Sequence, residues 1–486
     1  MLTYFPDRKF YRYLLPVVGY LLLLNFGLPN PASAQKKVNI QSADEVIGVT
    51  VEGEKVRKLI GDVHLRSKKL DMFCDSAYQY LNRSLIRAFG NIEINTQDEN
   101  IWADTLNYYT EKDLSQFRGR VIVENDSTTL FGHHVDYQFN QKIAHFLDHL
   151  RLEDQKGTLT AQSGYYFQKR DSAIFRGKVQ LADSLQYLEG DSLFMNRKEE
   201  HYKMYSGVYA RDGKNDLILT GDYMEADSTG RRVLENNAYL QKFKSDTTDT
   251  THMWAQRIVF TKKDTLSHIE AYQNVKIWSP KFSAVADTAI YDEAEDLFTL
   301  ISKPIAWHKN IQLTGPVIKV YLKDNEVDHL VSYPSPISVE KDTVSGRFNQ
   351  IKGDTITTNF SKGSIDKIYV RQNSHMLYNS KNEQGKADGA VEVQAVSTRI
   401  YFKEGSINEV KSLHSINGSY FPESESLKDK KLEGFKWNPE ARPQKPKSER
   451  TPRWAPIPEE RPFTLPERYI SSHPQRDHPP KEKIEK

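Results

Sequence analysis

The chain has 486 residues, and its 67 basic and 65 acidic side chains nearly cancel. A charge so close to neutral disfavours a nucleic-acid-binding protein, which normally carries a basic patch. The single cysteine, Cys74, excludes an internal disulfide and a cysteine-based metal site. The 26 Tyr and 22 Phe residues indicate a chain that buries a core rather than a disordered one, and they favour strands over helices.

The first 34 residues have the pattern of an export signal. Three basic residues precede an apolar stretch over residues 14–28, and the small residues Ala32-Ser33-Ala34 follow it. We therefore predict a signal peptide, residues 1–34, that is cleaved after Ala34. An uncleaved membrane anchor is the alternative, although the apolar stretch is shorter than the ~20 residues that cross a bilayer.

The sequence after the signal repeats with a period of 29 residues. Each unit is marked by a small residue that is often followed by Asp, as at Cys74-Asp75 and Ala103-Asp104. The first five of these anchors are separated by 29 residues every time, and the series continues to Ala395 with gaps of 29 to 42 residues. Such regular spacing indicates a repeat architecture, in which neighbouring units stack to bury one continuous core.

The residues around each anchor have the alternating pattern of a half-buried strand. Apolar residues recur two positions before the anchor and three positions after it, so a flat strand would place them on opposite faces. We therefore predict a bend or bulge at the anchor, where Asp can accept hydrogen bonds from nearby backbone N–H groups. Six anchor carboxylates are interpreted as structural corners: Asp75, Asp104, Asp191, Asp222, Asp287 and Asp354.

Each unit also contains a second strand. A polar turn follows the first strand, and a glycine stands sixteen residues after the anchor in several units, as at Gly90, Gly119 and Gly177. Glycine inside a strand marks a bulge or a bend, and alternating apolar residues such as Val121 and Val123 follow it. Each unit is thus a pair of bent strands, and the stacked units form an elongated sandwich, roll or solenoid.

The spacing also suggests the domain boundaries. The anchors are displaced near residues 230–255, so we divide the array into a first part, residues 35–235, and a second part, residues 236–420. Prolines and charged residues replace the pattern over residues 421–486. Proline cannot donate to a strand ladder, and this composition cannot bury a core. We predict a disordered or extended tail there, which serves as a solvated end, a tether or a partner-binding segment.

The sequence offers few candidates for chemistry. Four histidines fall in one unit, His133, His134, His145 and His149, but adjacent strand residues point to opposite faces, and we favour solvated or corner histidines over a metal site. The motifs of zinc proteases, serine hydrolases, phosphate-binding loops and calcium-binding repeats are missing. The recurrent Asp residues occur in many units, whereas a catalytic site is expected once. We predict no catalytic residue, no metal and no cofactor.

One stretch resembles the OstA/LptA-like family. It runs from Gly90-Asn91-Ile92-Glu93-Ile94 through Ile101-Trp102-Ala103-Asp104 to residues 117–123, and the resemblance extends over residues 38–200 and, more loosely, to residue 420. It implies an all-β fold, an elongated antiparallel β-jellyroll or "taco" built from ~29-residue two-strand repeats. It also implies that lipid A acyl chains bind in an open hydrophobic interior and that jellyrolls stack head to tail into a periplasmic bridge.

The resemblance further implies a periplasmic lipopolysaccharide-binding protein, with association with the outer membrane as a second option. Its expected partners are lipopolysaccharide and either other Lpt-type envelope proteins or a second copy, joined through edge strands. The side chains three and five positions after the anchors are the candidates that would face the lipid: Leu106, Tyr108, Val135, Tyr137, Tyr166, Leu193, Met195, Met224, Ile258 and Phe260.

Three alternatives remain open at this point. The interior can be a fully packed sandwich without room for a ligand. The repeats can belong to a parallel β-helix enzyme that acts on polysaccharide, although polar hairpin-like turns favour antiparallel pairs. The array can also be an envelope scaffold that binds protein and no lipid.

Overall fold

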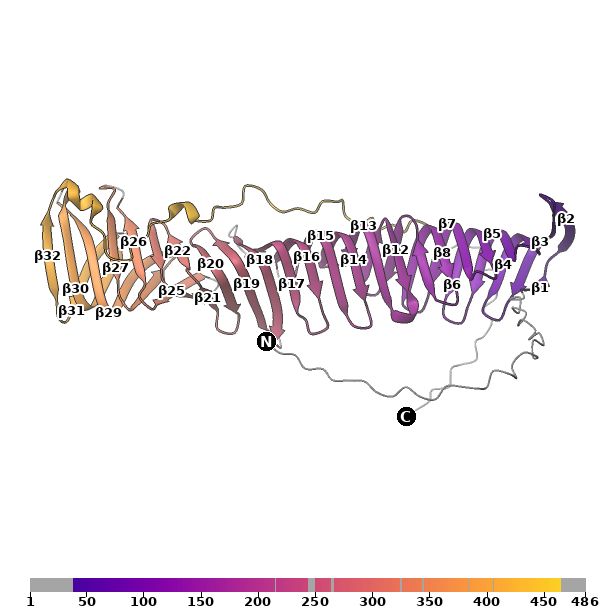
Figure 1. Ribbon diagram of the computed structural model, residues 1–486, viewed down its shortest axis with the longest axis horizontal. Coiled ribbons are helices and arrows are strands. Elements are labelled where there is room, and N and C mark those ends of the chain that lie inside the picture. The colour runs from indigo at the N-terminus through magenta and orange to yellow at the C-terminus, as the bar shows by residue number, and fades with distance from the viewer. Residues whose placement is uncertain are drawn as a thin grey trace, which may run out of the picture.

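The computed structural model describes residues 38–464 apart from a few short gaps, and these residues form one elongated all-β array (Figure 1). The predicted signal peptide and residues 465–486 lie outside the described part. No helix within it is long and apolar enough to cross a membrane. The gaps are residues 215, 244–249, 264–265, 324–325, 343–344, 383 and 405.

The described strands all pair antiparallel in one continuous sheet. The first fifteen are β1 (Asn39–Ser42), β2 (Glu45–Val51), β3 (Glu54–Arg66), β4 (Asp71–Tyr80), β5 (Leu85–Asn95), β6 (Asn100–Tyr109), β7 (Leu114–Glu124), β8 (Thr128–Gln138), β9 (Ile143–Phe146), β10 (Leu150–Asp154), β11 (Gly157–Ala161), β12 (Ser163–Phe167), β13 (Ser172–Ala182), β14 (Gln186–Asn196) and β15 (His201–Asp212).

The second half continues the same pattern. Its strands are β16 (Leu217–Ala226), β17 (Arg232–Phe243), β18 (Thr250–Lys263), β19 (Leu266–Trp278), β20 (Ser283–Asp292), β21 (Leu297–Ile301), β22 (Ile305–His308), β23 (Ile311–Thr314), β24 (Val317–Lys323), β25 (Glu326–Tyr333), β26 (Ile337–Lys341), β27 (Phe348–Lys352), β28 (Thr355–Ser361), β29 (Ser364–Lys381), β30 (Ala387–Lys403), β31 (Ser406–Leu413) and β32 (Asn417–Pro422). Three short 3-10 helices complete the described elements: η1 (Gln168–Arg170), η2 (Glu425–Asp429) and η3 (Pro439–Ala441).

Bends at the repeat anchors divide the array into two layers. The register of β4 against β5 shifts between Phe73 and Ser76, next to the anchor Cys74-Asp75. On β5 the backbone opposite turns through two residues with positive φ, Gly90 at +74° and Asn91 at +44°. Glycine and asparagine are the residues that adopt this left-handed conformation most readily. The odd step in the apolar pattern thus coincides with a bend that keeps both halves of a strand facing one core.

We call the two layers A and B and the side where their turns meet the mouth. Layer A contains the strand segments beside the turns at residues 67–70, 96–99 and 125–127, and layer B contains those beside the turns at residues 81–84 and 110–113. Turns of the two layers lie close together opposite the bends, because ion pairs join them there, as shown below. The predicted fold class, an elongated antiparallel β-jellyroll, is confirmed.

Apolar side chains from both layers fill the space between them. One cluster of buried residues runs from Leu59 to Val208 and a second from Leu219 to Ile400. Half-buried Met224 packs against both. The packing therefore divides between β15 and β16, a little before the division predicted from the anchor spacing. Cys74 is buried in the first cluster, as its place in the column of small residues suggested.

The chain after β32 turns back and runs along the outside of the array, as Figure 1 shows for the yellow segment. We call residues 423–464 the strap. Leu427 and Leu432 are buried against Val339 and Leu377 of layer A, and further along the strap Phe463 meets Phe131 at a ring-centroid distance of 5.8 Å. The structure therefore corrects the prediction of a disordered tail for residues 421–464. Proline bars these residues from the strand ladder, but an extended chain can still be held by side chains and carbonyl groups.

Candidate functional site

The interior between the two layers is the candidate site, and every residue predicted to face lipid contributes to it. Eight of the ten predicted residues are buried, whereas Met224 and Phe260 are half-buried. The first eight in chain order pack in or against the first cluster, and Met224, Ile258 and Phe260 belong to or pack against the second. Neighbouring side chains fill the interior around the fully buried members. The placement of these residues shows an apolar interior, and contact with a lipid remains a prediction.

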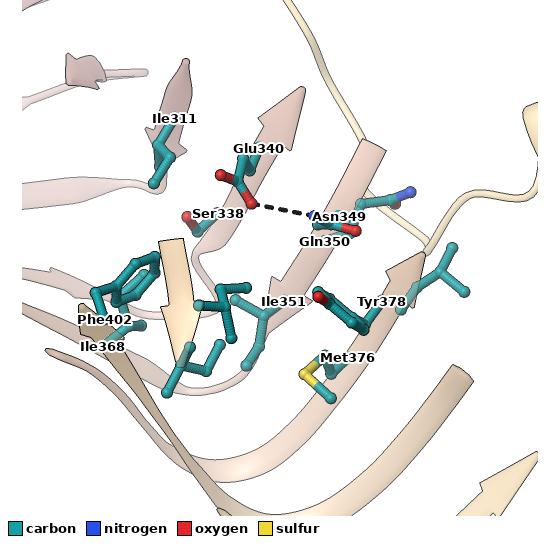
Figure 2. A pocket seen from close by; sticks show the side chains of 13 residues that line it. Ile311, Ser338, Glu340, Asn349, Gln350, Ile351, Ile368, Met376, Tyr378 and Phe402 are labelled. Carbon is teal, nitrogen blue, oxygen red and sulfur yellow. Dashed lines mark hydrogen bonds between the residues drawn. The ribbon is translucent and has the colours of Figure 1, made fainter. Parts of the chain in front are cut away.

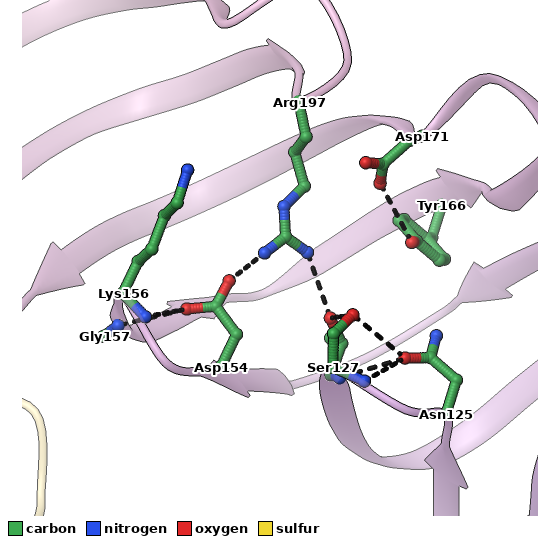
Figure 3. A network of polar contacts seen from close by, with 9 residues as sticks. Asn125, Ser127, Asp154, Lys156, Gly157, Tyr166, Asp171 and Arg197 are labelled. Atoms are coloured by element: carbon green, nitrogen blue, oxygen red, sulfur yellow. Dashed lines mark hydrogen bonds and ion pairs between the residues drawn. The ribbon is translucent and has the colours of Figure 1, made fainter. Parts of the chain in front are cut away.

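Polar contacts across the mouth close the array in its first half. Arg197, from a turn of layer B, forms an ion pair with Asp154 and donates a 3.0 Å hydrogen bond to Thr128, both beside turns of layer A (Figure 3). The Tyr137 hydroxyl donates to Glu99, and Lys142 pairs with Asp98, again from layer B to layer A. We call these contacts the latches. Each latch joins turns that belong to different repeats.

Burial makes the latches at Glu99 and Arg197 stronger than ordinary surface contacts. The side chains of Arg197 and Asp154 are only 15% and 10% exposed. Burial raises the pKa of Glu99, and the Tyr137 hydroxyl and the Lys142 ammonium oppose that increase. Burial also raises the pKa of Tyr137, and the neighbouring Glu99 carboxylate adds to this effect. Breaking a buried pair leaves one partner uncompensated, so these contacts hold the mouth shut there.

The mouth is less tightly covered in the second half. Apolar residues that pack against the second cluster remain half-buried, among them Phe260, Ile269 and Phe298. Lys281 pairs with Glu326 across the mouth at 3.1 Å, but these side chains are 50% and 44% exposed. Exposed ion pairs contribute about 0–1 kcal/mol to stability. The described residues of this half therefore hold the mouth together much more weakly than the latches do.

A pocket opens between the layers near the far end of the second half (Figure 2). Its empty volume is about 370 Å³. Apolar side chains from layer A, such as Ile351 and Met376, face Ile400 and Phe402 of layer B, and Glu340 accepts a 3.1 Å hydrogen bond from Asn349 on the polar side. An apolar pocket with a few fixed polar groups is the usual form of a ligand site.

The six predicted corner residues lie beside the strand bends. Asp75, Asp222 and Asp354 accept hydrogen bonds from Asn91, Asn237 and Asn373, with the shortest distance 2.8 Å at Asp222. Of the remaining three, Asp104 accepts from the backbone N–H of Arg120 at 2.9 Å, Asp191 pairs with Arg453 of the strap, and the backbone N–H of Asp287 donates to the carbonyl of Ser302.

The glycine columns fit against these carboxylates. A Cβ added to Gly90 would lie 2.3 Å from Asp75 Oδ2, and one added to Gly119 would lie 2.3 Å from Asp104 Oδ2. Both glycines also have positive φ. Side-chain volume and backbone conformation thus favour glycine at the same position, which accounts for the glycine sixteen residues after the anchor.

The histidines of the unit around residue 140 serve separate contacts. His134 pairs with Asp148 at 2.6 Å, His133 meets Phe463 of the strap, and the ring of His145 stacks on Tyr165 at 3.9 Å. His149 has a positive φ at the bend between β9 and β10. Within the described residues no group of three or more His, Cys, Asp or Glu side chains could hold a metal ion.

Reading the sequence missed the latches and the strap contacts. Arg197 and Asp154 are 43 residues apart, and Arg151 donates to three strap carbonyls, those of Pro458, Glu459 and Glu460, more than 300 residues away. No periodic pattern connects such positions. The asparagines at the bends left a usable signal, because Asn tolerates positive φ and recurs near the glycine column.

Comparisons with known proteins agree with this architecture. A family model described as OstA-like protein matches residues 35–191, and one described as LptA/(LptD N-terminal domain) LPS transport protein matches residues 158–326. The solved structures include that of LptH from Pseudomonas aeruginosa, the LptA homologous periplasmic component of a lipopolysaccharide transport device. It is 13% identical, with a TM-score of 0.23, and the match covers 29% of this chain and 95% of that chain. A search of curated proteins found no match.

The two layers, their bends and the apolar interior define an elongated antiparallel β-jellyroll protein. The two family matches overlap and together run from residue 35 to residue 326. The chain belongs to the OstA/LptA-like family of lipopolysaccharide transport proteins. The family expected from the repeat motif is thereby confirmed.

Proposed function

We propose that the mature chain is a periplasmic lipopolysaccharide carrier that shields lipid acyl chains between its two layers and helps to bridge to the outer membrane. The observation that carries this proposal is the apolar interior, which follows the array from Leu59 to Ile400. Each buried methylene contributes roughly 0.8 kcal/mol. A lipid with several acyl chains can therefore bind without a catalytic residue or a cofactor. The family matches and the signal-like first 34 residues support the periplasmic role.

The two ends of the array support assembly into a longer structure. At one end β2 pairs only with β3, and at the other end β31 and β32 each pair only with β30. Their free edges can receive another strand. Ile416 and Tyr420 near the second end are 60% and 56% exposed. We propose that these edges bind a second copy or another Lpt-type envelope protein.

Lipid that copurifies with the protein tests the proposal. The mature chain, expressed in a Gram-negative host and purified without detergent, is extracted and its lipids are identified by mass spectrometry. We expect lipopolysaccharide or its lipid A part in the extract. An extract without acylated lipid, together with no binding when lipid is added, contradicts the proposal and favours a protein scaffold. Cleavage of glycans by the purified protein would instead favour an enzyme.

A further inference from the structure

We propose that bound acyl chains lie in the second half of the interior, from β16 to β31, and that the first half is closed to them. This inference rests on the proposed function, because it places the lipid within the jellyroll. It divides the candidate residues: Met224, Ile258 and Phe260 would contact lipid, whereas Leu106, Val135 and the others before β15 would contact only protein.

The first half is closed by packing as well as by the latches. Tyr108, Tyr137 and Tyr166 stand near the mouth, and all three are buried. Phe139 is buried beside them and meets the rings of Tyr108 and Tyr137 at centroid distances of 6.2 and 4.8 Å. Acyl chains could enter here only if these rings moved and the Glu99 contact broke. Overpacking a filled core costs about 1–3 kcal/mol for even small additions.

The second half offers apolar surface that is already accessible. Half-buried residues recur from strand to strand along its mouth, and each packs against the second cluster: Leu217, Met224, Phe260, Ile269, Phe298, Leu322, Phe360, Phe402 and Ile407. Covering this surface with an acyl chain removes it from water without displacing a packed core. The pocket between Ile351, Met376 and Phe402 lies in the same half and is lined by both layers.

Methionine is concentrated where the two halves meet. Met195 and Met204 belong to the first cluster, Met253 belongs to the second, and Met224 touches both. Unbranched methionine side chains adapt to irregular or changing surfaces more easily than branched residues do. This junction can therefore seal the closed half against the open half with or without an acyl chain beside it.

Site-specific photocross-linking tests where the lipid lies. A photoreactive phenylalanine analogue replaces Phe260, Phe298 or Phe402 in the second half and Tyr108, Phe146 or Tyr166 in the first, with outward-facing Phe89 as the surface control. The full mature chain is irradiated with hexa-acylated lipid A. We expect cross-links several-fold stronger at the three positions of the second half than at the other four.

The possible results separate this inference from the proposed function. Cross-links of equal or greater strength in the first half overturn the inference but leave lipid binding intact. An absence of cross-links at every position removes the proposed function and the inference together. Hydrogen exchange on the unmodified chain guards against variants that fail to fold. Lipid A is expected to slow exchange in β17–β30, and slowing confined to β4–β13 would contradict the inference.

Discussion

At the residue scale, the bends depend on glycine for two separable reasons. Gly90→Ala introduces a side chain at a φ of +74° and also places Cβ 2.3 Å from Asp75 Oδ2. Gly385 has a φ of +76° but no heavy atom within 4 Å of a new Cβ. We expect Gly385→Ala to cost about 1 kcal/mol from the backbone alone. Gly90→Ala should cost about 2–4 kcal/mol, because the clash adds to it.

Urea unfolding of the two glycine variants beside the unmodified chain measures this difference. A Gly90→Ala variant no less stable than Gly385→Ala would show that the carboxylate moves aside easily. The bend would then depend on φ alone.

The Glu99 latch predicts a dependence of stability on pH. Burial raises the folded-state pKa of Glu99 above its model value of 4.5. The stability that this carboxyl contributes is full below pH 4.5 and is lost as the pH rises through the raised pKa. Glu99→Gln keeps an acceptor for Tyr137 without the charge, so we expect its stability relative to the unmodified chain to increase with pH. A constant difference between pH 4 and pH 8 would contradict this.

The partner residue gives the opposite change. Tyr137→Phe removes the donor and leaves the buried carboxylate of Glu99 without it, which should cost about 1–3 kcal/mol. Denaturation of Tyr137→Phe and Glu99→Gln at neutral pH compares the two directly. If Tyr137→Phe is as stable as the unmodified chain, the contact does not hold the mouth closed.

At the scale of elements, the strap is held by side chains that select an extended backbone. Arg151 donates to the carbonyls of Pro458 at 2.6 Å and Glu460 at 3.1 Å and also pairs with Glu153. Arg151→Met removes these bonds but retains much of the apolar stem. We expect it to release the strap, so that trypsin cleaves at Arg461 faster than in the unmodified chain. Lys411→Met, which removes an exposed pair with Glu409, is the control and should leave cleavage unchanged.

The same comparison shows which elements a sequence can predict. The bent strands could be predicted because the anchor Cys74-Asp75 and its equivalents recur at a fixed spacing. The strap could not, because its composition fits a solvated chain and its docking depends on Arg151 and Phe131, which are far away in sequence. The latches were missed for a related reason. Which turns face each other across the mouth depends on the stagger of the layers, and local patterns do not encode that stagger.

At the scale of the whole molecule, the array has free edges at both ends. Ile416 and Tyr420 are exposed apolar residues at the β32 end. Replacing both with Glu should weaken self-association, because like charges would meet wherever two such edges pair. Leu185→Glu, on a turn away from the ends and 57% exposed, is the control. Sedimentation velocity over a range of concentrations measures the effect, and association unaffected by the double substitution would place the interface elsewhere.

The array also ties its candidate site to its shape. The family and the jellyroll could be predicted from the repeat, since every unit contributes the same alternating strands. The difference between a latched half and an accessible half could not, because it arises from individual side chains such as Arg197 and Phe260 rather than from the period. An array of near-identical repeats can thus hold a site in only part of its length.

The central claim is that the interior shields acyl chains. Titration of the mature chain with hexa-acylated lipid A and with fully deacylated lipid A, followed by native mass spectrometry, tests it most directly. We predict a complex with the acylated form and none with the deacylated form, because the binding energy comes from buried methylene groups. Equal binding of both forms, or binding of neither, would contradict the account.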